Sequence, residues 1–142
     1  MPGRLFTIGY EGRDQGEYLS LLREAGVTVL ADVRANPMSR KKGFSKKALA
    51  QGCETAGIRY VHLPELGIPS ARRKGLKTRA DYDALFGVYA REWLPRQGEA
   101  LDRIRAWLER GERVALTCYE REAGRCHRRF VAEALGFEAR NL

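Results

Sequence analysis

The sequence has no long hydrophobic run, and this absence limits the classes of protein to which the chain can belong. A membrane-spanning helix needs about 20 consecutive apolar residues, and no stretch of the 142-residue chain approaches that length. The opening residues 1–4 also lack the pattern of a signal peptide. We therefore expect a cytoplasmic protein that has no membrane partner.

Cysteine is also scarce, with three residues in the whole chain. A small, odd number argues against a disulfide framework and favours free thiols or site residues in a reducing compartment. Cys53 lies within a helical pattern, so we interpret it as a small packing residue. Cys118 and Cys126 flank a polar segment instead, which makes them candidates for chemistry.

Internal repeats, low-complexity tracts and a break between domains are absent too, so residues 1–142 are expected to form a single domain. Short apolar runs predict strands at residues 5–8, 28–33, 58–63 and 113–118. Helical spacing predicts helices at residues 15–25, 46–56, 81–93, 99–110 and 130–135. The order βαβαβααβα predicts an α/β fold with a mostly parallel sheet of about four to five strands and helices on both faces.

Acidic residues are outnumbered by basic ones, with 18 Asp and Glu against 26 Lys and Arg and a formal net charge of +8. This excess favours polyanionic partners, of which nucleic acid is the first candidate. A charge-rich surface of the kind found in heat-adapted proteins explains the composition equally well. Two basic segments support the first interpretation, because residues 40–47 follow the second predicted strand and residues 72–79 follow the third.

Polar side chains also follow each predicted strand. The carboxyl ends of parallel strands lie at one edge of a sheet, where α/β proteins bind ligands. We therefore expect one crevice bordered by Tyr10, Glu11, Asp32, Arg34, His62, Glu65, Cys118, Tyr119 and Glu120. A structural interpretation stands beside this one, since Asp32 can pair with Arg34 and His62 can be a packed, hydrogen-bonded residue.

Residues 118–128 concentrate the chemistry of the chain, with Cys118, Glu120, Cys126, His127 and Arg128. A thiol between a strand and a helix start becomes a thiolate nucleophile when the helix dipole and nearby arginines stabilise it. The segment resembles the loops of cysteine phosphatases and rhodaneses only in part. Phosphatases have an arginine six residues after the cysteine, and here that position is a glycine.

A metal site is another interpretation of this segment, with Cys118, Glu120, Cys126 and His127 as nominal ligands. Neighbouring residues such as Cys126 and His127 point about 100° apart on a helix and do not readily share one ion. The spacing matches no standard zinc pattern, so we expect neither metal nor cofactor. In the structural alternative, the cysteines pack and Glu120 bonds to Arg128 or to backbone amides.

Several spaced motifs run along nearly the whole chain: residues 7–12, 32–34, 37, 39–40, 57–60, 64–67, 118–120 and 126–128. Together, and in this order, they resemble the bacterial and archaeal family called domain of unknown function 488. The resemblance implies a small α/β domain and assigns no reaction. The motif positions that it marks are Gly9, Tyr10, Asp32, Arg34, Pro37, Ser39, Glu65, Cys118, Glu120, Cys126, His127 and Arg128.

The leading hypothesis is a nucleic-acid-binding protein, with DNA favoured over RNA, that holds a nucleotide or an extruded base in the crevice. Whether it acts on the bound nucleotide is open. Binding of nucleic acid or another anion is assigned to Tyr10, Arg34, Arg40, Lys41, Arg72, Arg73 and Arg128. Catalytic roles, if the protein is an enzyme, are assigned to Cys118, Glu120, His127 and Asp32.

Two alternatives remain. The first is an enzyme that uses Cys118 as a thiolate nucleophile, with His127 or His62 as acid or base, for sulfur transfer or hydrolysis of a small anionic substrate. The second is a non-catalytic interaction module whose polar segment merely folds tightly. The sequence predicts no oligomeric state.

Overall fold

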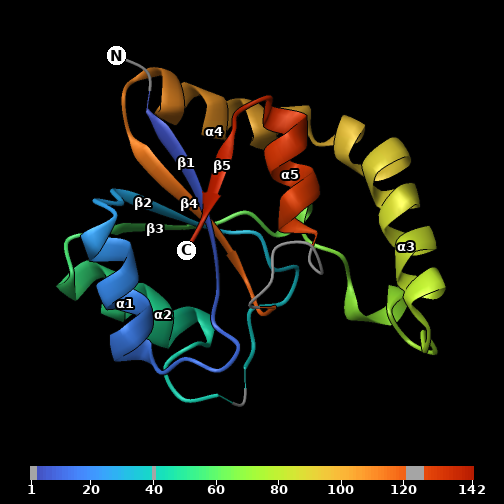
Figure 1. Ribbon diagram of the computed structural model, residues 1–142, viewed down its shortest axis with the longest axis horizontal. Coiled ribbons are helices and arrows are strands. Elements are labelled where there is room, and N and C mark those ends of the chain that lie inside the picture. Colours follow the sequence, from blue (N-terminus) through green and yellow to red (C-terminus); the bar gives the residue numbers. More distant parts are fainter. Residues whose placement is uncertain (1–2, 40, 121–126) are drawn as a thin grey trace.

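The fold is built on one sheet of five parallel strands in the order β3-β2-β4-β1-β5 (Figure 1). The computed structural model describes residues 3–39, 41–120 and 127–142. The strands are β1 (Arg4–Gly9), β2 (Val29–Asp32), β3 (Arg59–His62), β4 (Arg113–Cys118) and β5 (Ala139–Asn141). The predicted α/β class with a parallel sheet is confirmed, and β5 adds a short edge strand after the last predicted helix.

The register of the strands brings their carboxyl ends to the same level. Gly9 pairs with Cys118, and Asp32 lies between Thr117 and His62. The strand β4 is central and is buried from its second residue to its last, as a continuous apolar run requires when helices cover both faces of a sheet. The residues that follow four different strands therefore meet at one edge, which we call the carboxyl edge.

Helices cover both faces of this sheet, as predicted. Their bounds are α1 (Gln15–Glu24), α2 (Lys46–Thr55), α3 (Arg79–Val88), α4 (Gly98–Glu109) and α5 (Arg128–Leu135). The helices α1 and α2 lie on one side of the sheet, and α4 and α5 lie on the other (Figure 1). Alternate strand residues separate into two cores, with Phe6 and Ile8 facing α1 and α2 and Leu5 facing the opposite helices.

The chain between β3 and α4 departs most from the prediction. The expected helix at 81–93 is α3 followed by a π-helical turn at Tyr89–Trp93 and a 3-10 turn at Leu94–Arg96. Two further 3-10 turns, Pro64–Leu66 and Ser70–Arg72, lie in the connection before α3. Within the described parts of the chain, no helix has the length and apolar character needed to cross a membrane.

The start of α2 is held differently from the expectation. Ser45 occupies the N-cap position, but its side chain makes no capping hydrogen bond. The amide of Lys46 instead donates to the carbonyl oxygen of Pro37 at 2.8 Å. The connection from β2 to α2 is therefore tied to the helix that follows it.

Candidate functional site

A cavity of about 160 Å³ opens at the carboxyl edge. Its walls come from the segments that follow β1, β2, β3 and β4, and from the residue that precedes α5. The lining residues are Tyr10, Arg34, Ala35, Asn36, Ile68, Arg73, Cys118, Tyr119, Glu120 and His127. Seven residues that the sequence analysis assigned to the crevice or to its chemistry thus meet in one place: Tyr10, Arg34, Arg73, Cys118, Tyr119, Glu120 and His127.

Asp32 and Arg34 form a buried ion pair beside this cavity. Nε of Arg34 donates to Oδ1 of Asp32 at 2.8 Å and Nη2 donates to Oδ2 at 2.6 Å. Although burial opposes the charge, the Asp32 carboxylate raises the pKa of Arg34 above its ordinary value. The carboxylate is fully buried and also accepts a hydrogen bond from Tyr60. Asp32 therefore positions Arg34 and does not reach the cavity.

The remaining donor of Arg34 is also directed inward. Nη1 donates to the carbonyl oxygen of Phe44 at 2.6 Å and to the hydroxyl of Tyr10 at 3.3 Å. All three guanidinium nitrogens thus have acceptors within the protein. Arg34 was expected to contact phosphate, and in the structure it fastens the connection after β2 and orients Tyr10. The sequence showed the charge of this residue but not its burial.

The aromatic side chains at the cavity form a stack with one exposed ring. Tyr10 is stacked on Phe44, with ring centroids 4.6 Å apart. Tyr119 contacts Tyr10 edge to face at 5.3 Å and is 48% exposed. An exposed ring with aromatic support behind it is a suitable surface for a planar ligand.

His127 is the most buried polar group of the cavity wall. Its Nε2 lies 2.7 Å from the carbonyl oxygen of Val33, which can only accept. Nε2 therefore carries the proton, and Nδ1 is an acceptor that lies 3.5 Å from Nη2 of Arg73. Burial lowers the pKa of His127 to about 4, so the imidazole is neutral at neutral pH.

Arg73 reaches the cavity from the connection between β3 and α3. Its Nη1 lies 3.7 Å from Oε1 of Glu120, and the two side chains are 33% and 26% exposed. Its Nε is buried and has no hydrogen-bond partner in the described part of the chain. The guanidinium is therefore weakly held by the protein and is suited to bind a ligand with acceptor atoms.

Gly67 sets the position of the connection that carries Arg73. A Cβ atom on this glycine would lie 2.1 Å from the backbone nitrogen of Ala35. The backbones that follow β2 and β3 therefore touch at this point, and no larger residue fits between them. This contact brings Ile68 and Arg73 to the same cavity as Arg34.

Cys118 lies in the cavity wall but differs from the expectation of a free thiol. It is 2% exposed and disulfide-bonded, whereas Cys53 is a free, buried cysteine. A count of cysteines contains no distance between sulfur atoms, so the sequence could not predict this bond. For Cys53 the packing role is confirmed, and burial raises the pKa of its thiol to about 12.

Arg128 supports the cavity from behind. It is 1% exposed, and Nη1 donates to Sγ of Cys118 at 3.0 Å and to the backbone oxygen of Glu120. Burial lowers the pKa of Arg128 to about 10. The guanidinium thus holds the end of β4 in place, which fits the structural alternative better than contact with an exposed anion.

The other predicted residues lie around the cavity. His62 is half-buried and Nε2 bonds to the carbonyl oxygen of Arg34 at 2.7 Å, as the packed alternative predicts. Arg72 is exposed, with its guanidinium 5.0 Å from the ring centroid of Trp93, and Lys41 is half-buried. Arg40 and Cys126 lie outside the described residues. In the described ranges, no three His, Cys, Asp or Glu side chains cluster as metal ligands.

Three lining residues, Ala35, Asn36 and Ile68, were not expected from the sequence analysis. Ala35 and Asn36 follow Arg34 directly, so their place after a strand end was a usable signal. Ile68 has no comparable signal, because it reaches the cavity only through the close approach at Gly67.

Comparison with known proteins places this architecture in a family. A crystal structure of a Shewanella putrefaciens CN-32 protein, named "Putative phosphatase (DUF442)", is similar with a TM-score of 0.51 and 17% identity. The match covers 96% of this chain and 67% of that chain, and at this identity it concerns the fold alone. No curated protein matches. The model of the family described as "Domain of unknown function DUF488" matches residues 15–135. The chain therefore belongs to the DUF488 family.

Proposed function

We propose that the protein binds DNA at the carboxyl edge and holds one nucleotide or an extruded base at the cavity. The observation that carries this proposal is the distribution of charge along the chain. Residues 33–47 and 63–79 contain eleven of the 26 Lys and Arg but one of the 18 Asp and Glu. Both segments border the cavity, so almost all the charged side chains that these segments offer to a phosphate backbone are cationic.

The cations available to phosphates lie on the surface of the two connections and at the starts of α2 and α3. The exposed basic residues there are Lys42, Lys46, Lys47, Arg72, Lys74, Lys77 and Arg79. Arg34 and Arg128 are already held by acceptors inside the protein, so they support the site and do not contact the strand. Arg73 is the arginine that combines a place in the cavity wall with weak internal contacts.

Tyr119 supplies the surface on which a base stacks. Its ring is 48% exposed and rests against Tyr10, which in turn stacks on Phe44. Stacking of a base on an aromatic side chain contributes about 1–3 kcal/mol. Beside the ring, Glu120 accepts hydrogen bonds and Arg73 donates them, as the polar edge of a base requires.

The proposal is tested by fluorescence anisotropy with labelled single-stranded DNA, duplex DNA and RNA at low and moderate salt. DNA binding that weakens steeply with salt is expected, because bound phosphates release counterions. Tyr119→Ala is expected to weaken binding by about tenfold or more, and Tyr119→Phe is expected to retain it. Tyr82→Ala is the matched control, because Tyr82 is an exposed tyrosine of α3 outside the cavity wall.

Two results would contradict the proposal. One is an affinity for DNA that does not change between low and moderate salt. The other is an equal loss of DNA affinity in Tyr119→Ala and Tyr82→Ala. That result would show that DNA does not bind at the cavity. Tighter binding of RNA than of DNA would reverse the assignment of the nucleic acid.

A second candidate function rests on the contact between Arg128 and Cys118. In the reduced protein, a guanidinium 3.0 Å from Sγ favours the thiolate, which could attack a small anion bound by Arg73 and expel its leaving group with the bonding electron pair. The test is the rate of alkylation of reduced Cys118 against pH, followed by peptide mass spectrometry. A rate profile that matches an unperturbed thiol would rule this candidate out.

A further inference from the structure

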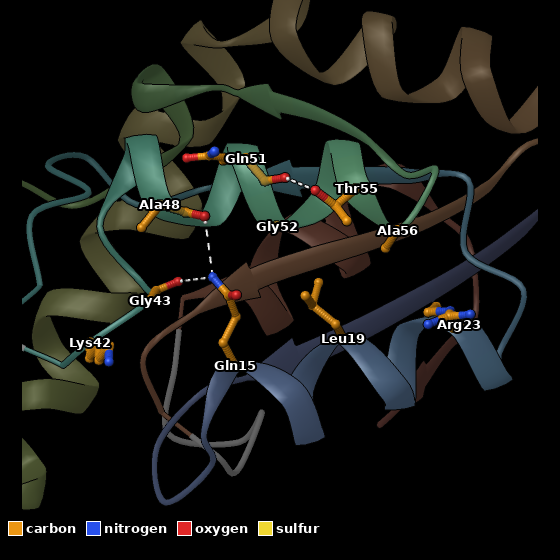
Figure 2. Close-up of a pocket in the computed structure, with 10 residues that line it drawn as sticks. All are labelled: Gln15, Leu19, Arg23, Lys42, Gly43, Ala48, Gln51, Gly52, Thr55 and Ala56. Atoms are coloured by element: carbon orange, nitrogen blue, oxygen red, sulfur yellow. Dashed lines mark hydrogen bonds between the residues drawn. The ribbon is translucent and has the colours of Figure 1, made fainter.

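A second, larger cavity lies between α1 and α2 (Figure 2). Its volume is about 490 Å³. We call it the interhelical groove, and its lining residues are Gln15, Leu19, Arg23, Lys42, Gly43, Ala48, Gln51, Gly52, Thr55 and Ala56. None of these residues lines the cavity at the carboxyl edge. The groove is therefore a separate feature of the surface that the proposed function has not used.

The groove exists because one of its walls is made of small residues. Ala48 and Gly52 of α2 and Ala56 at its C-cap are spaced by four, and they face a stripe of α1 that has the same spacing. One end of the groove is closed by Gln15, whose Nε2 donates to the carbonyl oxygens of Gly43 at 2.7 Å and Ala48 at 3.2 Å (Figure 2). A Cβ on Gly52 would approach this amide to 3.0 Å, so the wall has little room for a larger residue there.

The charge of the groove is of one sign. Arg23 and Lys42 are both exposed, and no carboxylate lines the groove among the described residues. The other polar lining groups, Gln51 and the hydroxyl of Thr55, are uncharged. An anionic ligand with hydrogen-bonding groups fits this lining, whereas an acidic or purely apolar wall would exclude it.

The groove also continues the surface that is proposed to bind DNA. Lys42 and Gly43 belong to the connection after β2, which forms part of the wall of the carboxyl-edge cavity. Because α1 and α2 both begin at the carboxyl edge, the groove starts there and runs along the helices to Arg23 near the end of α1 (Figure 2). A strand that leaves the cavity along this connection reaches the groove at Lys42 and Gly43, and must cross the side chain of Gln15, which bridges the two walls at this end.

We propose that the interhelical groove holds the continuation of the bound DNA as a single strand, with its phosphates beside Lys42 and Arg23. This inference rests on the proposed function and extends it to a defined path and a defined form of DNA. A cavity of this volume accommodates a ligand of small-molecule size. One sugar-phosphate chain therefore fits between the helices and a duplex does not.

The test compares a thymidine tetranucleotide with a dodecanucleotide, because only the longer strand spans the cavity and the groove. The wild-type protein is expected to bind the dodecanucleotide more tightly. Arg23→Glu and Thr55→Trp, which reverse a charge and fill the groove, should weaken dodecanucleotide binding by about fivefold or more and leave tetranucleotide binding within about twofold. Arg23→Glu should also reduce the salt slope for the dodecanucleotide by about 1.

Arg103→Glu is the matched control, since Arg103 is an exposed arginine of α4 on the opposite face of the sheet. Thermal unfolding of each variant establishes that it is folded. The inference is overturned if groove variants bind the dodecanucleotide as wild type does, or if Arg103→Glu weakens it equally. The proposed function is tested separately in that case, by the effect of Tyr119→Ala on DNA affinity. Absence of any DNA binding by the wild type would overturn the proposed function itself.

Discussion

Asp32 and Arg34 place two opposite charges inside the protein, and the free energy of unfolding should depend on both. Asp32→Asn leaves the guanidinium buried without its carboxylate. Removal of one partner of a buried ion pair costs about 3–5 kcal/mol. We expect a loss of that order, measured by urea unfolding at neutral pH.

The matched control for this pair is Asp102→Asn on α4. Its carboxylate is 74% exposed and pairs with Arg105 at 2.8 Å. Exposed pairs contribute about 0–1 kcal/mol, so this variant should be nearly as stable as the wild type. Equal losses in the two variants would show that burial does not determine the effect.

His127 should make the stability of the protein dependent on pH. Burial lowers the pKa of this imidazole to about 4 in the folded state, below the ordinary histidine pKa of about 6.5. Between these values the unfolded chain binds a proton that the folded protein does not, so stability is complete above pH 6.5 and falls as pH falls toward 4. The full effect is at most about 3 kcal/mol.

Urea unfolding at several pH values between about 5 and about 7 checks this prediction. His127→Gln removes the titrating group and should flatten the profile, although its stability at neutral pH is lower. His62→Gln is the control, because it removes the other histidine of the chain. If stability depends steeply on pH in His127→Gln but not in His62→Gln, the pH dependence comes from His62, and the prediction is wrong.

The connection between β3 and α3 depends on the glycine where it touches the preceding connection. Gly67→Ala places a methyl group 2.1 Å from the backbone nitrogen of Ala35, so one of the two backbones must move. We expect a loss of about 1–3 kcal/mol and weaker DNA binding, since Arg73 moves with its segment. Calorimetry and anisotropy measure the two effects.

Gly98→Ala at the start of α4 provides the comparison. A Cβ there meets no atom within 4 Å, and alanine is favoured over glycine in a helix. This variant should be as stable as the wild type or slightly more stable. A similar loss in both variants would mean that glycine flexibility, and not the close contact at Gly67, is what the fold requires.

The same elements show how far the sequence predicts the fold. The bounds of β4 at 113–118 agree with the prediction because an unbroken apolar run ends at a polar segment. The π-helical turn at Tyr89–Trp93 was hidden, since apolar spacing continues through it. The strand β5 has three residues, two of them exposed, and so lacks the alternation that marks a longer strand.

For the site, the rule that ligands bind after strand ends correctly predicted that Tyr10, Cys118 and Glu120 lie at one cavity. It could not rank Arg34 against Arg73, because both have the same charge in the sequence and only the structure shows which is enclosed. Side-chain burial depends on contacts between distant segments, and a single sequence does not contain those contacts.

The charge of the molecule is distributed asymmetrically. DNA affinity should depend more on where the positive charges lie than on the net charge. Lys74→Glu with Lys77→Glu lowers the net charge by the same amount as Arg103→Glu with Arg110→Glu. The first pair lies on a connection of the carboxyl edge and the second on and directly after α4. The first double variant should bind DNA much more weakly and with a smaller salt slope.

Anisotropy titrations of single-stranded DNA across a salt series measure this difference. The second double variant should stay close to the wild type in both affinity and slope. Equal weakening in the two double variants would indicate attraction by the overall charge of the protein, without a defined binding surface.

The strand order has a consequence for synthesis of the chain. Among the described strands, β1 pairs with β4 and β5, and β4 separates β1 from β2. While a ribosome is still translating the first hundred or so residues, Phe6 and Ile8 belong to a strand that has no partner. Sheets that join distant segments form slowly and expose apolar surface in the meantime. We therefore expect the nascent protein to expose the apolar face of β1 until β4 has been synthesised, and a chain truncated before β4 to aggregate.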